Sequence, residues 1–159
     1  MKLFYSMALG MLLAGLVAGA APVQAQGQPS GGSSVQHAHA IAAVCPGAWE
    51  SPACLTAVSR SNMDMVSNYG ATLQQNRQDA AAETLKQHCA ASTAHSEQQF
   101  PAYAMREAFV ECANIISDLH DQTGFKPHQG HYQLLIAPIM CLDKNDQCRG
   151  YEQALQKYR

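Results

Sequence analysis

The sequence is poor in charge and has no basic stripe. Of its 159 residues, 10 are Lys or Arg and 12 are Asp or Glu, and the basic residues do not gather in one segment. Nucleic-acid binding needs concentrated positive charge, and so does electrostatic binding to an anionic membrane surface. The composition therefore predicts no nucleic-acid partner and no basic membrane-binding surface.

The motifs of common enzymes are also absent. The chain has no Gly-x-Ser-x-Gly elbow, no His-Glu-x-x-His, no glycine-rich phosphate loop and no Cys-x-x-Cys pair. Asp118 and His120 could place a carboxylate beside an imidazole, but at the end of an amphipathic helix such residues more often form a solvated capping cluster. We therefore expect a protein that is not an enzyme, with a small hydrolase built on these two residues as a remote alternative.

Only the amino-terminal segment carries a long apolar run. It extends from about Met7 to Ala21, follows Lys2, and is interrupted by three glycines. A membrane span needs about 20 continuous apolar residues, whereas here small residues lead to a cleavage site after Ala25, as in a secretory signal peptide. Residues 1–36 contain no cysteine, which excludes a lipoprotein anchor. We expect residues 1–25 to be cleaved, leaving a periplasmic or secreted chain without stable membrane insertion.

All six cysteines follow the predicted signal peptide. An even number of cysteines in an oxidising compartment predicts three disulfides. Of the fifteen pairings, the one between nearest neighbours suits a bundle in which consecutive helices pack antiparallel. The predicted disulfides are Cys45–Cys54, Cys89–Cys112 and Cys141–Cys148.

Hydrophobic periodicity predicts an all-α fold of five or six helices, stapled by these disulfides. Residues 26–34 are small and polar and are expected to form a flexible tether, and residues 35–159 a single helical domain. Gly70 is a candidate end or bend within the second helix, and Gly124 suits the end of the fourth. In residues 132–142 the apolar positions are too continuous to separate a helix from a strand pair, and we favour a helix because no other segment offers a strand partner. The expected helices lie near 35–44, 51–76, 79–91, 132–142 and 147–157, with the strongest one between Pro101 and Gly124.

The segment CLDKNDQC, residues 141–148, places three Asp or Asn residues between two cysteines. An EF-hand loop that began at Asp143 would need glycine at its sixth position and glutamate at its twelfth. The chain has Cys148 and Ala154 there. We therefore expect a polar, disulfide-closed turn in place of a calcium loop.

Histidines provide the other candidate metal ligands. His37 and His39 form one pair and His128 and His131 another, but a zinc site commonly needs three or four converging ligands. The sequence therefore predicts no metal and no cofactor. Seven histidines in a chain with few charges leave open a metal-handling or acid-responsive protein as the alternative function.

These observations favour a small exported, non-enzymatic domain that binds another protein. An inhibitor, an immunity protein or an accessory protein of the cell envelope belongs to this class. Aromatic side chains in or beside loops often supply interface anchors, which makes Trp49 and Tyr103 candidate partner-binding residues. The alternative is that both only close the core.

Overall fold

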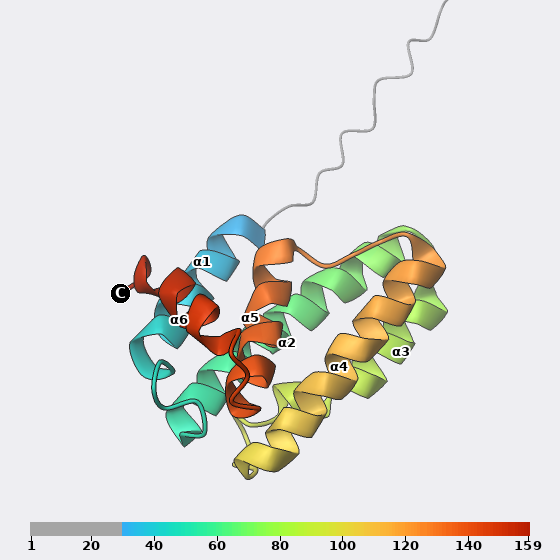
Figure 1. Ribbon diagram of the computed structural model, residues 1–159. Coiled ribbons are helices and arrows are strands. Elements are labelled where there is room, and N and C mark those ends of the chain that lie inside the picture. The colour runs from blue at the N-terminus through green and yellow to red at the C-terminus, as the bar shows by residue number, and fades with distance from the viewer. Residues whose placement is uncertain (1–29) are drawn as a thin grey trace, which may run out of the picture.

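The computed structural model describes residues 30–159, so the predicted signal peptide and residues 26–29 of the predicted tether lie outside it. The described residues form an all-α bundle without strands, which confirms the fold class (Figure 1). The elements are α1 (Ser30–Val44), α2 (Pro52–Gln75), α3 (Asp79–Cys89), a 3-10 turn η1 (Ala91–Thr93), α4 (Ala102–Thr123), α5 (Gln129–Leu142) and α6 (Cys148–Gln156).

Helix α1 begins at Ser30, whereas composition predicted a flexible tether over residues 26–34. The first described side chains of α1 are docked on the bundle. The hydroxyl of Ser33 donates a hydrogen bond to Asp64 of α2 at 2.9 Å, and Ser34 is buried. Tertiary contacts therefore order small polar residues that have little tendency to form a helix on their own.

Helix α2 is the longest helix of the described chain, and it lies against α1, α3 and α5. The side chain of Ser51 accepts a hydrogen bond from the backbone N–H of Cys54, and Pro52 occupies the first turn, as helix N-termini favour. Gly70 neither ends nor breaks the helix. A Cβ there would lie 3.9 Å from the side chain of Leu85 in α3, which is an ordinary van der Waals contact, so packing does not require glycine at this position.

Helix α4 ends as the sequence predicts. Gly124 adopts the left-handed conformation with φ of 76°, and its N–H donates to the carbonyl of His120. The following loop is tied to α2, since the hydroxyl of Tyr69 donates to the carbonyl of Phe125 at 2.7 Å.

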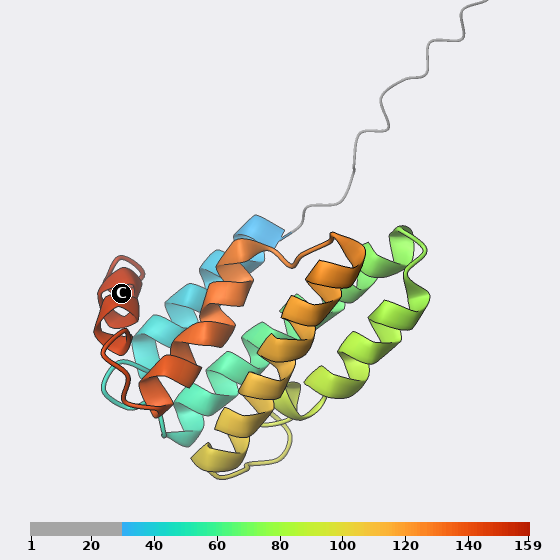
Figure 2. The same ribbon diagram turned by 45° about the vertical axis from the view of Figure 1, so that its right-hand side comes forward.

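Residues 129–142 form one helix, α5, with Pro138 inside it, which confirms the helix over the strand pair. The helix lies between α1, α2, α4 and α6, so its apolar residues are buried around most of its circumference. In both views α3 lies at one side of the bundle and α6 at the opposite side, near α1 (Figure 2).

The three disulfides have the predicted nearest-neighbour pairing. Cys45–Cys54 joins the end of α1 to the start of α2, Cys89–Cys112 joins α3 to α4, and Cys141–Cys148 joins α5 to α6, with Cα–Cα distances of 4.7, 4.5 and 4.7 Å. Such cross-links indicate an oxidising compartment. No helix among the described residues is both long and apolar enough to cross a membrane.

Candidate functional site: a buried histidine cluster

Four titratable side chains from three helices meet where α1 and α5 begin. His37 comes from α1, Asp64 from α2, and His128 and His131 from the start of α5. The Nε2 atom of His37 lies 2.7 Å from Oδ2 of Asp64. The ring centroid of His131 lies 6.0 Å from that of His37 and 5.8 Å from that of His128. We call these four residues the histidine cluster.

His131 is the buried centre of the cluster. Only 1% of its surface is exposed, and its Nε2 atom has no hydrogen-bond partner among the described residues. Burial lowers the pKa of His131, and the neighbouring His37 and His128 lower it further, whereas Asp64 opposes them. Perturbed titratable groups of this kind are enriched at functional sites.

His95 shows what a satisfied buried histidine looks like in the same protein. It is also 1% exposed, but its Nδ1 lies 3.1 Å from the hydroxyl of Thr56 and its Nε2 lies 3.2 Å from the carbonyl of Phe100. Both ring nitrogens therefore have partners. His95 holds the loop before α4 through its contact with Phe100, whereas Nε2 of His131 has no hydrogen-bond partner among the described residues.

Close packing at the start of α5 helps to form the cluster. A Cβ on Gly130 would lie 3.2 Å from ring atoms of His128 and 3.2 Å from the hydroxyl oxygen of Ser34. A larger residue would push these groups apart. The glycine therefore lets α5 approach α1 with an imidazole folded over its first turn.

Asp64 is held by α1 on one side. Burial alone would raise its pKa, but the hydrogen bonds from His37 and Ser33 together keep the pKa below its ordinary value. The sequence offered Asp64 only as part of a weak metal-binding candidate, Met63-Asp64-Met65. Its local pattern does not show that residues 27 and 31 positions earlier lie against it.

The cluster combines one member of the first predicted histidine pair with both members of the second. His39 points elsewhere, and its Nδ1 contacts the carbonyl oxygen of Tyr158 near the carboxyl terminus. In the described chain no three His, Cys, Asp or Glu side chains are grouped so as to hold a metal ion. The four side chains of the cluster can gain and lose protons.

Apart from the histidine cluster, the domain has a shallow, mainly apolar hollow on the outward sides of α1 and α2. Most of its lining side chains are small, Arg60 is the charged one, and Gln99 from the loop before α4 completes the edge. We call this surface the α1–α2 face. It is formed by Ala40, Ala43, Val44, Pro52, Ala53, Thr56, Ala57, Arg60 and Gln99.

The two predicted partner-binding residues lie in opposite environments. Trp49 is only 6% exposed, packs in the core, and donates from Nε1 to Glu152 of α6 at 2.8 Å. Tyr103, in the first turn of α4, is 75% exposed. Trp49 therefore closes the core and has little surface for a partner, whereas Tyr103 is freely accessible.

Asp118 and His120 do not share a pocket. Asp118 lines a hollow between α3 and α4, together with His88, Glu107 and Glu111. His120 lines another hollow, with Lys126 and Tyr132. Residues two apart on a helix diverge by about 200°. The arrangement that the remote hydrolase alternative required is therefore not formed.

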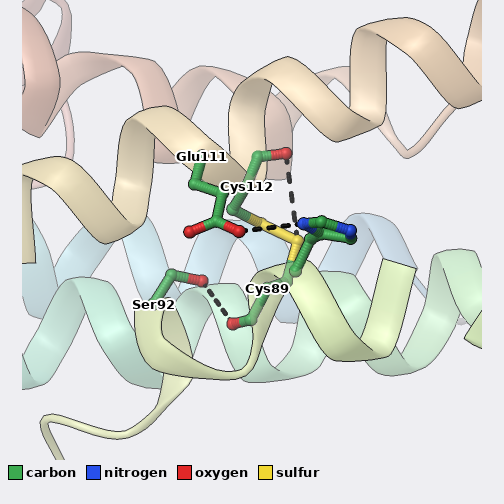
Figure 3. Close-up of polar contacts among 5 residues, drawn as sticks. Cys89, Ser92, Glu111 and Cys112 are labelled. Carbon is green, nitrogen blue, oxygen red and sulfur yellow. Dashed lines mark hydrogen bonds and ion pairs between the residues drawn. A yellow bond between two sulfur atoms is a disulfide. The ribbon is translucent and has the colours of Figure 1, made fainter. Parts of the chain in front are cut away.

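Figure 3 shows the Cys89–Cys112 disulfide between α3 and α4, next to Glu111, which lines the same hollow as Asp118. His88 Nδ1 lies 2.8 Å from Oε1 of Glu111, and Ser92 donates to the carbonyl of Cys89. Both partners of the His88–Glu111 contact are about half exposed, so water screens it. These contacts reinforce the junction of α3 and α4.

The CLDKNDQC turn is fixed by the disulfide and by a guanidinium. Arg106 of α4 donates from Nε and Nη2 to the two carboxylate oxygens of Asp143, at 2.7 and 2.9 Å. The side chain of Asn145 accepts from the N–H of Gln147 and supports the start of α6. The polar residues of this turn therefore connect α4, α5 and α6.

No family model matches the chain, and neither a curated protein nor a solved structure does. The fold and the site define a class only, that of a small all-helical domain cross-linked by three disulfides.

Proposed function

We propose that this protein is a small exported domain that binds another protein and catalyses no reaction. It would act in the periplasm or outside the cell as an inhibitor, an immunity protein or an accessory protein of the envelope. The predicted signal peptide and the three disulfides support an oxidising location. The disulfides also give the domain a rigid frame, which reduces the entropy that is lost on binding.

The observation that carries the proposal is the α1–α2 face. Its apolar side chains are left uncovered by the rest of the described chain, and Val44 is 36% exposed. A contiguous exposed apolar surface is typical of a protein-interaction site. Phe100, which follows Gln99 in the loop before α4, is also 37% exposed.

The shape and charge of this face favour an α-helix of the partner. Ala40, Ala43, Ala53 and Ala57 lie on two adjacent helices, so a third helix can approach their backbones closely and lay its apolar side over them. Arg60 has no carboxylate within ion-pair distance among the described residues. The partner helix is therefore expected to carry an acidic residue opposite Arg60.

The test compares single charge substitutions on exposed alanines. Ala43→Arg and Ala53→Glu place a charge on the α1–α2 face, and Ala80→Arg places one on α3, outside it. The oxidised protein and each variant are immobilised and exposed to an envelope extract. We expect one protein to be captured by the wild type and Ala80→Arg and lost with both face variants.

The captured protein is then purified and its binding measured directly. Hydrogen exchange should show protection of residues 40–44 and 52–60 in the complex, and Arg60→Glu should weaken binding at least tenfold. Tyr103→Ala tests whether the exposed aromatic belongs to the same interface. Equal capture by all variants, or protection confined to another surface, would contradict this binding mode.

A further inference from the structure

We propose that the histidine cluster is an acid-sensitive clasp that holds the first half of α1 on α2 and α5 at neutral pH and releases it in acid. This property goes beyond the proposed protein binding and does not depend on it.

The contacts of α1 with the histidine cluster come from its first half, whereas His39 and the carbonyl of Ala42 in its second half contact Tyr158 and Arg159 near the carboxyl terminus. Ser33 and His37 both bind Asp64, and the ring of His37 lies against the ring of His131. The second half is held by other means, since Ile41 and Ala42 are buried in the core and Cys45 is bonded to Cys54. Titration of the cluster therefore acts on one half of the helix.

A proton on His131 creates a buried charge, which burial and two neighbouring imidazoles disfavour and which Asp64 alone among the cluster favours. The groups that act on it are His37 from α1, His128 from its own helix and Asp64 from α2. The two imidazoles oppose a positive charge, and Asp64 is already hydrogen-bonded to Ser33 and His37. Helices α4 and α6 also pack on α5, but their ties to it through Asp143 and Cys141–Cys148 lie at its other end.

The sign of the pH effect follows from the buried state of His131. Its pKa in the folded protein lies below its ordinary value of 6.5, so the open form takes up a proton more readily than the closed one. The closed form is fully favoured above pH 6.5 and loses stability as the pH falls below that value. For one proton, the equilibrium constant for opening rises by at most about tenfold per pH unit.

The opening is expected to be local. The Cys45–Cys54 disulfide keeps the end of α1 attached to the start of α2, so the helix cannot leave the domain. Its first half can move about this point while α3 and α4, which are joined by their own disulfide, stay folded. Such a movement would uncover His131 and the beginning of α5.

Hydrogen exchange of the oxidised protein between pH 7.5 and 5 tests the clasp, after correction for the pH dependence of the intrinsic exchange rates. We expect residues 33–41 to lose protection by up to tenfold per pH unit below 6.5, while α3 and α4 keep theirs. In His131→Phe this pH dependence should disappear. His120→Gln, which removes an exposed histidine of α4 outside the cluster, should respond like the wild type.

Two results would overturn the proposal. One is unchanged protection of residues 33–41 in wild-type protein at pH 5, and the other is an equal pH response in a folded His131→Phe variant. Should that variant fail to fold, NMR titration of the His131 ring in the wild type decides the matter. A midpoint below 6.5 supports the clasp, and a midpoint at or above 6.5 rejects it.

Discussion

The indole nitrogen of Trp49 donates a hydrogen bond to Oε1 of Glu152 at 2.8 Å, across 103 positions of sequence. The same carboxylate oxygen accepts the backbone N–H of Gly47 at 3.0 Å. One side chain of α6 therefore holds the turn between α1 and α2. The only tryptophan of the chain thus connects the α1–α2 turn to the last helix, α6.

Trp49→Phe is expected to lower the free energy of unfolding by about 1–2 kcal/mol. It keeps an aromatic ring in the core but loses a hydrogen bond to a charged, half-buried partner. Urea denaturation at pH 7.5, followed by far-ultraviolet circular dichroism, measures the change. Tyr103→Phe is the control, since its exposed ring should change stability by less than about 0.5 kcal/mol. Equal effects of the two substitutions would contradict the assigned role of Trp49.

Gly124→Ala and Gly150→Ala are expected to act in opposite directions. Neither added methyl group meets an atom within 4 Å, so packing does not decide the result. Gly124 has φ of 76°, where alanine is strained, and its substitution should cost about 1 kcal/mol. Gly150 lies within α6, where alanine should add about 0.5–1 kcal/mol. Thermal unfolding of the two variants tests the difference in sign.

Removal of the Cys89–Cys112 disulfide is expected to cost about 2–4 kcal/mol, because the bond closes a loop between two buried helix positions. The double variant Cys89→Ala/Cys112→Ala measures this in urea. The Cys141–Cys148 disulfide closes a shorter loop, so the Cys141→Ala/Cys148→Ala variant should lose less free energy of unfolding. A larger loss in the second variant would show that the α5–α6 turn contributes more than chain entropy alone.

Asp143 should contribute to stability in a more acidic range than His131. Its hydrogen bonds to Arg106 keep its pKa below the ordinary value of 3.8, so its contribution is complete above that pH and is lost as the pH falls further. Asp143→Asn should therefore reduce the fall in stability below pH 4 and leave the change between pH 7.5 and 5 as in the wild type. Urea midpoints across both ranges check this. If Asp143→Asn also changed how the urea midpoint depends on pH above pH 5, the turn at residues 141–148 would be coupled to the histidine cluster.

Sequence periodicity was sufficient for the helices that have one buried side. In α4 the buried residues Met105, Phe109, Cys112 and Ile116 recur at three- and four-residue steps. In α5 the neighbours Leu134 and Leu135 are both buried, because other helices surround it, so the helical period is not visible in its sequence. For residues 132–142 the sequence favoured a helix over a strand pair only because no other segment offered a partner strand.

The candidate site was only partly accessible from sequence. His128 and His131 are close along the chain, and the sequence identified them as one candidate pair. The approach of His37, 94 positions before His131, depends on how α1 packs against α5, which local pattern does not encode. From sequence, Trp49 could either bind a partner or close the core. Its burial and its hydrogen bond to Glu152, which favour the core, are visible only in the structure.

The nearest-neighbour pairing of the cysteines also bears on how the protein matures. Each disulfide joins two cysteines that are consecutive in the chain. A polypeptide that enters an oxidising compartment amino terminus first exposes both members of each pair before the next pair arrives. Oxidation in order of arrival would therefore form the native cross-links without any rearrangement of mispaired thiols.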